Sequence, residues 1–328
     1  MSFEGDSGMK VAVIHDYLGV AERMADWSRV RALAELDFFT APFDDDDVVA
    51  QLAGYDVICA MRERLPLTAA LMDRLPRLKM YVATSERNRV IDFDAARERG
   101  IEIAATPSGG LARAATAELA WGLLLAASRG IVAEDRAVRD GTWQTMPFPS
   151  LYGRTIGIVG LGGVGRYIAR YAHAFGMSVL AWSPHLAEMA CVEAGATKVE
   201  LDDLLQLSDV VTLHIVASES TRHLIDARAL ALMKPTAVLV NTSRGALVDE
   251  VALVDALRLG RLRAAALDVF EREPLHPDDP LTKLDNALLS PHSAGFTEET
   301  YQVWYQGTVD AVVAFLEGRE IPIRHLPG

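Results

Sequence analysis

The stretch from Thr155 to Ser183, TIGIVGLGGVGRYIARYAHAFGMSVLAWS, decides the fold. It opens with the short apolar run Ile156 to Val159, which predicts a buried strand. The pattern G-x-G-x-x-G follows at 160–165, and apolar residues then recur at helical spacing as far as Phe175. A second apolar run, Val179 to Trp182, predicts the next strand. This order of strand, turn, helix and strand is the context that a dinucleotide-binding fingerprint requires.

Each glycine of the motif has a physical role. Gly160 permits a tight turn out of the strand, Gly162 lets the backbone approach a pyrophosphate, and Gly165 permits close packing of helix on strand. The free N–H groups at the helix start, including those of Gly163 and Val164, are predicted to face the phosphates at the positive end of the helix dipole. A glycine-rich turn without a ligand is the alternative, but the flanking strands and helix favour a nucleotide.

The composition excludes several classes of protein. The chain has 328 residues, half of them hydrophobic, which predicts two domains with sizeable cores. Its net charge of −13 repels phosphate backbones, so nucleic acid is not expected as a partner. No Cys/His cluster has zinc spacing, and the acidic run from Asp44 to Asp47 is expected to be a solvated helix start, so no metal is predicted.

The location is expected to be cytoplasmic. Cys59 and Cys191 lie in apolar surroundings, which is typical of buried free thiols in a reducing compartment. The N-terminus lacks the apolar core of a signal peptide, and no run of about 18 apolar residues is present to span a membrane.

Strand and helix patterns alternate on both sides of the opening stretch. Before it, strands are expected at 11–14, 37–39, 56–61, 79–83 and 101–103, and helices at 20–36, 48–53, 67–75, 92–99 and 112–128. After it, strands are expected at 210–215, 237–241, 264–269 and 287–289, and helices at 250–259 and 298–316. Such alternation predicts parallel sheet and an α/β fold. No predicted strand of the nucleotide unit remains for the final helix to pack against, so we expect this helix to belong to the first domain.

Three polar clusters follow predicted strands of the nucleotide unit. They lie at 241–245 (NTSRG), 267–274 (LDVFEREP) and 290–295 (SPHSAG). The carboxyl ends of the strands line the ligand crevice of a doubly wound sheet. We therefore expect an arginine, a glutamate and a histidine to converge there.

These residues, Arg244, Glu273 and His292, are the types that hydride transfer to a 2-oxo acid needs. A histidine can take the hydroxyl proton as the hydride leaves. A carboxylate beside it stabilises the imidazolium. An arginine pairs with the substrate carboxylate and polarises the carbonyl. Each residue alone also has an ordinary structural explanation, and spacing by itself does not show that the three meet.

Five segments carry a family resemblance: GRTIGIVGLGGVGR, SDVVTLHI, MKPTAVLVNTSRGALVDE, AALDVFEREPL and SPHSAG. Through them the chain, from about Asp56 to Pro322, resembles the D-isomer-specific 2-hydroxyacid dehydrogenases. The resemblance implies that His292 is the acid/base, that Glu273 supports it and that Arg244 binds the substrate. The implied substrate is a small D-2-hydroxy acid or 2-oxo acid.

The resemblance also implies an architecture. It consists of two doubly wound parallel-sheet domains, a Rossmann NAD(P)-binding domain at 109–295 inserted into a flavodoxin-like substrate domain at 1–108 and 296–328. This agrees with the expected return of the last helix. The family is usually homodimeric through its nucleotide domains, so a homodimer is expected.

The substrate domain carries a loop similar to one that binds the substrate carboxylate in the family. On this basis Ser85, Glu86 and Asn88 are predicted to bind substrate, although the family commonly has glycine where Ser85 stands. Arg62 matches a strand-end turn of the same pocket. A further hypothesis, against the alternative of ordinary surface arginines, is that a second anionic group of the substrate meets a basic rim of Arg62, Arg64, Arg87 and Arg89.

The cofactor residues depart from the NAD pattern at one position. NAD-specific folds place an acidic residue roughly 20 residues beyond the glycines, and Ser183 stands there. No arginine follows to bind a 2′-phosphate, and His185 is the only cationic candidate nearby. NAD is therefore favoured, with NADP possible. The resemblance places Asp268 near the nicotinamide carboxamide, and Thr242 and His214 are further candidate cofactor contacts.

Three alternatives remain on the same fold. One is an NAD(H)-sensing corepressor without turnover, because some family members act in that way. A formate-type dehydrogenase would have glutamine where Glu273 stands, so it is not favoured. A phosphoglycerate-type dehydrogenase often carries a regulatory C-terminal domain, but short versions exist, so this alternative stays open.

Overall fold

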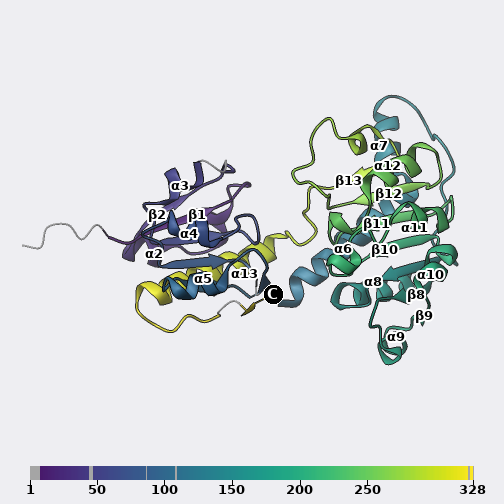
Figure 1. Ribbon diagram of the computed structural model, residues 1–328. Helices are drawn as coiled ribbons and strands as arrows, with labels where there is room; N and C mark the ends of the chain where they lie inside the picture. The colour runs from purple at the N-terminus through teal and green to yellow at the C-terminus, as the bar shows by residue number, and fades with distance from the viewer. Residues whose placement is uncertain (1–7, 44–46, 86, 108, 324–325, 328) are drawn as a thin grey trace, which may run out of the picture. The chain divides into compact units, whose positions relative to one another are not determined.

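The computed structural model describes residues 8–43, 47–85, 87–107, 109–323 and 326–327. The chain divides into two compact units. Unit 1 comprises Met1–Leu111 with Phe296–Gly328, and unit 2 comprises Ala112–Gly295. Each is built around a parallel sheet, of five strands in unit 1 and seven in unit 2 (Figure 1).

Unit 1 has the strand order β2-β1-β3-β4-β6, and every neighbouring pair is parallel. The strands are β1 (Lys10–Ile14), β2 (Glu35–Phe38), β3 (Val57–Ala60), β4 (Met80–Ala83) and β6 (Glu102–Ala105). A small separate sheet pairs β5 (Arg87–Asn88) with β14 (Leu326–Pro327). The helices are α1 (Ala21–Met24), α2 (Ser28–Leu33), α3 (Asp47–Leu52), α4 (Ala69–Asp73), α5 (Phe93–Glu98) and α13 (Glu298–Leu316). The order is that of flavodoxin-like sheets.

Alternating side chains of β1 enter the two cores of unit 1. Val11 and Val13 belong to the cluster that contains Trp304 of α13, whereas Ala12 and Ile14 belong to the cluster beneath α3, α4 and α5. A strand buried on both faces explains why β1 reads as a continuous apolar run. The last helix, α13, is thus part of unit 1, as the sequence predicted.

The helix predicted over 20–36 is wrong, because the chain there forms α1, α2 and β2. Ala25 is extended, and the Asp26 carboxylate accepts a hydrogen bond from the Ser28 amide at 3.0 Å, a local bond that competes with a continuous helix. The Trp27 indole is buried and donates to the Ala21 carbonyl at 2.8 Å. Pairing with β1 then draws Glu35 into a strand.

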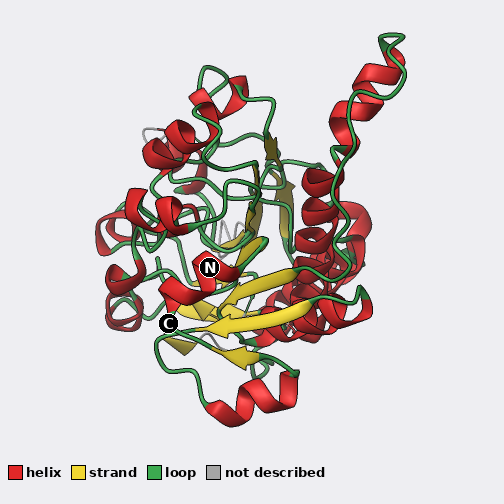
Figure 2. Cartoon of the chain, turned by 90° about the vertical axis from the view of Figure 1, so that its right-hand side faces the viewer, coloured by secondary structure: helices red, strands yellow, loops and turns green. Residues whose placement is uncertain are grey.

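Unit 2 has the strand order β13-β12-β11-β10-β7-β8-β9, again parallel throughout. Its strands are β7 (Thr155–Val159), β8 (Ser178–Trp182), β9 (Thr197–Lys198), β10 (Val210–Leu213), β11 (Val238–Asn241), β12 (Ala264–Leu267) and β13 (Ala287–Leu289). Its helices are α6 (Gly109–Arg129, which starts in unit 1), α7 (Ile131–Arg139), α8 (Gly163–Ala174), α9 (Glu188–Ala194), α10 (Leu201–Leu207), α11 (Ala227–Leu232) and α12 (Glu250–Arg258), with short 3-10 turns η1 (Glu219–Thr221), η2 (Gly245–Leu247) and η3 (Pro280–Lys283). Helices flank the strands (Figure 2).

The chain order reverses beside β7, which lies between β8 and β10. Such a reversal is where open α/β sheets bind ligands, outside the carboxyl ends of the strands. The glycine motif follows β7 directly, so it lies at this point. The predicted α/β class with two doubly wound parallel sheets is confirmed.

Helix α7 was not predicted, and none of its residues is buried. Its exposed apolar side chains include Ile131, Val132 and Val138, and Trp143 and Met146 are exposed in the irregular stretch that follows. Among the described residues no single helix has the length and apolar character to cross a membrane; α6 and α7 meet that test only as a pair, bent by 58°.

Candidate active site

The turn after β7 can be built only with glycine at two positions. Gly160 has φ +102°, and a Cβ there would lie 2.6 Å from the carbonyl carbon and oxygen of His214. A Cβ on Gly165 would lie 2.2 Å from the Gly160 carbonyl oxygen. These contacts hold α8 close against the end of β7. At Gly162, by contrast, no described heavy atom lies within 4 Å of a Cβ position, so this face of the turn is open.

The open turn fits the diphosphate of a dinucleotide. Gly162 is the N-cap residue of α8 and supplies no side-chain cap, and the first turn of the helix has no acidic residue. The amides of that turn, including those of Gly163 and Val164, are therefore available to an anion. At the carboxyl end of β11, the Thr242 hydroxyl is buried and has no hydrogen-bond partner among the described residues. A polar ligand atom would satisfy it.

His292 and Glu273 form a hydrogen-bonded pair at the carboxyl end of the same sheet. His292 Nδ1 lies 2.6 Å from Glu273 Oε2, and Glu273 Oε1 accepts a hydrogen bond from the Phe270 amide at 3.0 Å. Partial burial raises the pKa of Glu273, but its hydrogen bonds and the charges of His292 and Arg244 outweigh that effect, so the pKa lies below its ordinary value. The His292 side chain remains 41% exposed, so the ring is accessible to a ligand.

Asp268 fixes the turn that carries His292. Its fully buried carboxylate accepts hydrogen bonds from the amides of Ser293 and Ala294, both at 2.9 Å, and its carbonyl accepts from the His292 amide at 2.7 Å. These bonds hold His292 at φ +51°, a conformation that costs free energy in a non-glycine residue. The prediction that Asp268 also contacts the nicotinamide end of the cofactor stays a prediction.

Arg244 lies in the neighbouring loop, after β11. The Asn241 side chain holds that loop by donating to the Arg244 carbonyl at 2.9 Å and accepting from the Ser243 amide at 3.0 Å. A Cβ on Gly245 would lie 1.9 Å from the carbonyl carbon of Phe270, so this loop packs directly against the segment that leads to Glu273. The structure thus brings together in unit 2 the three residues that the sequence proposed as catalytic.

The other candidate cofactor residues differ in their surroundings. Burial of the His214 side chain lowers its pKa to about 3 and keeps the imidazole neutral near pH 7. Its Nε2 lies 2.8 Å from the Thr212 hydroxyl. Ser183 follows β8 and is half-buried, and His185 is exposed. The acid that an NAD-specific fold places after the second strand is therefore replaced by a neutral hydroxyl.

In unit 1 the described members of the predicted substrate-binding set, Arg62, Ser85 and Asn88, lie near the ends of β3 and β4. The Arg62 amide donates to the Thr84 hydroxyl at 2.8 Å, and the Asn88 side chain donates to the Arg62 carbonyl at 3.0 Å. Asn88 is buried, so its side chain supports the Arg62 turn. The Ser85 amide donates to the Thr106 hydroxyl at 2.9 Å. Glu86 and the side chain of Arg87 lie outside the described residues.

Strained backbone marks the same edge of unit 1. His15, Arg62 and Ser85 follow β1, β3 and β4, and have φ values of +61°, +53° and +86°. Non-glycine residues in this region cluster at functional sites. Sequence reasoning missed His15 as a candidate, although a His-Asp pair directly after a buried strand was the available signal.

His15 lies among aromatic and cationic groups. Burial, with a smaller effect from the charge of Arg64, lowers its pKa to about 4, and its Nδ1 has no partner among the described residues. Arg64 donates to the His15 carbonyl at 2.7 Å, and its guanidinium carbon lies 4.4 Å from the Tyr17 ring centroid. A neutral histidine and a cation thus share this strand end.

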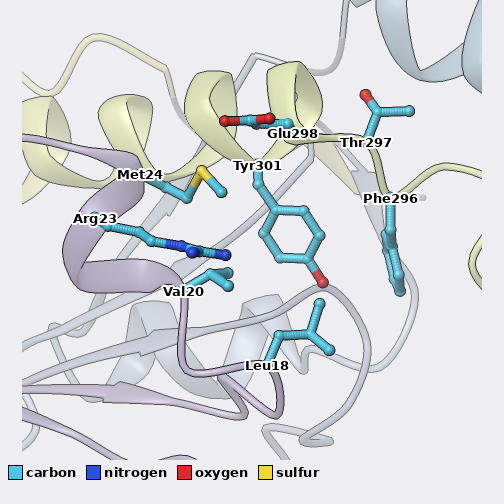
Figure 3. Close-up of a pocket in the computed structure, with 8 residues that line it drawn as sticks. All are labelled: Leu18, Val20, Arg23, Met24, Phe296, Thr297, Glu298 and Tyr301. Carbon is cyan, nitrogen blue, oxygen red and sulfur yellow. The ribbon is translucent and has the colours of Figure 1, made fainter.

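A pocket of about 340 Å³ lies in unit 1 (Figure 3). Its wall combines apolar, aromatic and charged side chains from the loop after β1, from α1 and from the start of α13: Leu18, Val20, Arg23, Met24, Phe296, Thr297, Glu298 and Tyr301. The Arg64 guanidinium carbon lies 5.5 Å from the Phe296 ring centroid. Figure 3 shows Tyr301 extending from α13 towards Leu18. Within the part of the chain that the structure describes, no group of three or more His, Cys, Asp or Glu side chains could hold a metal ion.

Comparisons with known proteins identify the relatives of this chain. A family model for the NAD binding domain of D-isomer specific 2-hydroxyacid dehydrogenases matches residues 121–294. The chain is 38% identical over 303 residues to the glyoxylate reductase of Korarchaeum cryptofilum, with 90% of each protein covered. It is 36% identical over 293 residues to the D-3-phosphoglycerate dehydrogenase of Archaeoglobus fulgidus, covering 89% of this chain and 54% of that protein.

A similar solved structure is that of the phosphoglycerate oxidoreductase from Vibrio cholerae O395. The two superimpose with a TM-score of 0.87 at 31% identity, covering 94% of this chain and 99% of the other. The similarity therefore extends over both units and is not confined to the nucleotide motif.

Proposed function

We infer the function from one premise: the chain belongs to the D-isomer-specific 2-hydroxyacid dehydrogenase family. It is an NAD-dependent oxidoreductase of 2-hydroxy acids. We propose that it reduces a small 2-oxo acid of the glyoxylate type to the corresponding D-2-hydroxy acid, with His292 as acid/base. The observation that carries this proposal is the 2.6 Å pair between His292 Nδ1 and Glu273 Oε2, at the same carboxyl edge of the sheet as the open nucleotide turn.

In the proposed mechanism the chain transfers one proton and holds two groups in place, the His292 ring and the substrate carboxylate. Bound NADH supplies the hydride to C2 of the 2-oxo acid. His292 gives its proton to the C2 oxygen as negative charge develops there, and takes it back in the reverse direction. The Glu273 carboxylate holds the ring through Nδ1 and stabilises the imidazolium, because its lowered pKa keeps it ionised. Arg244 pairs with the substrate carboxylate and polarises the carbonyl.

We propose that the backbone N–H groups of Ser85, Glu86 and Asn88, together with Arg62, bind the substrate carboxylate in unit 1. The support is the strained backbone at Arg62 and Ser85 and the hydrogen bond by which Asn88 fixes the Arg62 carbonyl. Backbone strain of this kind persists only where the surrounding structure enforces the conformation, and such residues cluster at functional sites. Asn88 then acts as a positioning residue for the turn.

The preference for NAD over NADP is proposed from Ser183. The hydroxyl does not repel a 2′-phosphate, but no arginine follows β8 to attract one. We expect Ser183→Asp to weaken NADPH binding at least about tenfold through charge repulsion, with little change for NADH. Equal losses for both cofactors, measured by nucleotide fluorescence, would contradict a 2′-phosphate position next to Ser183.

We propose that the protein is a homodimer and that α7 contributes to the interface. An exposed helix with Ile131, Val132 and Val138, followed by exposed Trp143, leaves apolar surface that a second copy would cover. Sedimentation of a Val132→Glu, Val138→Glu variant should show a monomer. An unchanged dimer would place the interface elsewhere.

A cytoplasmic location is proposed from the two cysteines. Cys59 and Cys191 are both free and buried, and burial raises the pKa of each thiol, which keeps them protonated and unreactive. Cell fractionation with a tagged chain would test this proposal.

Phosphoglycerate-type activity is the second candidate. Its specific support is the similarity to the Archaeoglobus fulgidus enzyme, together with Arg62 and Arg64 at the strand ends of unit 1, which would suit a second anionic group on the substrate. Equal efficiency on monocarboxylic and doubly anionic substrates would eliminate the second-anion hypothesis.

The deciding experiment measures NADH and NADPH oxidation with glyoxylate, pyruvate, hydroxypyruvate, 2-oxoglutarate and oxaloacetate, and D-3-phosphoglycerate oxidation in the reverse direction. His292→Gln serves as the paired variant. Loss of a proton-transfer group lowers turnover by about 10²–10⁴-fold, whereas NADH binding should persist. NADH binding without turnover on any substrate would instead favour a corepressor-type protein.

A further inference from the structure

Arg113 of α6 lies over the first residue of the nucleotide-binding helix. A Cβ built on Gly163 would be 2.8 Å from Arg113 Cδ, 3.3 Å from its Nε and 3.7 Å from its Cζ. The arginine side chain therefore passes through the space that any side chain at position 163 would occupy. Both residues belong to unit 2.

This arrangement places two positive features side by side. The first turn of α8 presents unpaired amides and the positive end of the helix dipole. The Arg113 guanidinium adds a full positive charge, and among the described residues it makes no hydrogen bond or ion pair. No acidic side chain occupies the first turn of α8 to neutralise either feature.

NAD, the cofactor of this family, carries a diphosphate, and a glycine-rich turn from strand to helix is where such a group binds. From this geometry we propose that Arg113 binds the pyrophosphate of NAD(H), and that glycine at position 163 is required because it leaves room for the arginine. A planar guanidinium can donate two parallel hydrogen bonds to phosphate oxygens. The cation thus comes from α6, fifty residues before Gly163, whereas the glycine motif itself supplies only backbone groups.

The inference rests on the NAD-binding domain of the family and not on a particular substrate. Its test is therefore a binding measurement without turnover, so that failure of the substrate assignment leaves the result interpretable. NADH binding is followed by the change in nicotinamide fluorescence. Arg113→Gln is compared with Arg129→Gln, which removes the same charge from the exposed last turn of the same helix.

We expect Arg113→Gln to raise the Kd for NADH at least about tenfold, the loss typical of a hydrogen bond to a charged group, and Arg129→Gln to leave it unchanged. ADP, which retains the diphosphate, should lose affinity in parallel when it competes with NADH. Adenosine, which lacks phosphate, should bind both variants and the wild type equally. A Kd for NADH within twofold of wild type in Arg113→Gln would overturn the proposal.

The role of Gly163 is tested by a double-mutant cycle. Gly163→Ala places a methyl group where Arg113 Cδ lies, so it should displace the guanidinium and raise the Kd for NADH in the wild-type background. In the Arg113→Gln background the same change should have much less effect, because the group that it displaces is gone. Additive losses would show that Gly163 does not act through Arg113, and circular dichroism of each variant confirms that the fold is retained.

Discussion

In each unit an aspartate binds the first residue of the first strand of the sheet in the same way. Asp56, just before β3, accepts hydrogen bonds from the Lys10 amide at the start of β1 and from Arg77, and forms an ion pair with Lys79. Asp209, just before β10, does the same for the Thr155 amide at the start of β7, with Arg154 and Lys234 as its cations. In both sheets the aspartate thus ties the first strand to its neighbour across the reversal of strand order.

At the opposite end of the first strand the units differ. After β1, the buried Asp16 carboxylate accepts hydrogen bonds from the amides of Val20 at 3.0 Å and Ala21 at 2.8 Å. After β7, Gly162 leaves the corresponding amides at the start of α8 without a side-chain partner. Unit 1 satisfies these donors with its own carboxylate, whereas unit 2 leaves them for an anionic ligand. The two turns therefore differ in whether a side chain caps the amides at the start of the helix.

The strongest test transfers the carboxylate of unit 1 to unit 2. Gly162→Asp should abolish NADH binding, with a loss on the order of 100-fold or more, because the new charge repels the diphosphate and competes for its amides. The free energy of unfolding should rise by a few tenths of a kcal/mol, since aspartate is a better N-cap than glycine. Gly162→Asn is the matched neutral control. If both variants lose NADH affinity equally, the size of the new side chain and not its charge is what impairs NADH binding at position 162.

The reverse change removes the capping carboxylate from the turn of unit 1. Asp16→Ala leaves two buried amides without an acceptor and removes the partner of the Tyr305 hydroxyl, so it should lower the free energy of unfolding by about 2–3 kcal/mol. Asp16→Asn, which keeps one acceptor oxygen, should cost less. Urea unfolding measures which of the two variants is less stable, and the NADH affinity of unit 2 should not change in either. A smaller loss for alanine than for asparagine would contradict the capping role.

The paired aspartates should respond alike to acid. Burial raises the pKa of Asp56 and of Asp209, but hydrogen bonds and neighbouring cations outweigh it, so both values are lowered. A lowered folded-state pKa stabilises the protein above the unfolded-state value near pH 4, and this contribution is lost as the pH falls through the folded-state value. At pH 7, Asp56→Asn and Asp209→Asn should each cost about 1.5 kcal/mol.

Urea midpoints at pH 7 and pH 3 measure this effect. The difference between wild type and variant should shrink at the lower pH, more clearly for Asp56, whose side chain is 1% exposed against 15% for Asp209. A difference that is independent of pH would mean that the carboxylate charge contributes nothing.

The smallest effect is expected at a strand end of unit 1. Ser85 has φ +86°, so Ser85→Gly should stabilise the protein by about 0.5 kcal/mol, the relief of strain being partly offset by the greater freedom of glycine in the unfolded chain. Ser183→Gly, at a strand end of unit 2 without positive φ, should be neutral or slightly destabilising. Thermal unfolding of the ligand-free variants measures both, and a lower melting temperature for Ser85→Gly would show that the serine side chain contributes more than the strain costs.

Local sequence determined the nucleotide motif of unit 2 almost completely. The apolar runs and glycines of 155–183 predicted β7, α8 and β8, because strand and helix periods and the steric freedom of glycine act over neighbouring residues. The same local rules failed over 20–36, where the burial of Trp27 and the pairing of β2 with β1 overrode a helical pattern.

The sequence by itself also identified Arg244, Glu273 and His292 as chemically suitable, from their types and their places after strands. Only the tertiary structure decided that His292 contacts Glu273, that Asp268 holds the turn that carries His292, and that the Arg113 side chain lies over Gly163. Spacing along a chain restricts which residues can share a local element. Contacts between residues that lie far apart in the sequence depend on strand register and helix packing, which are properties of the assembled sheet and not of any single segment.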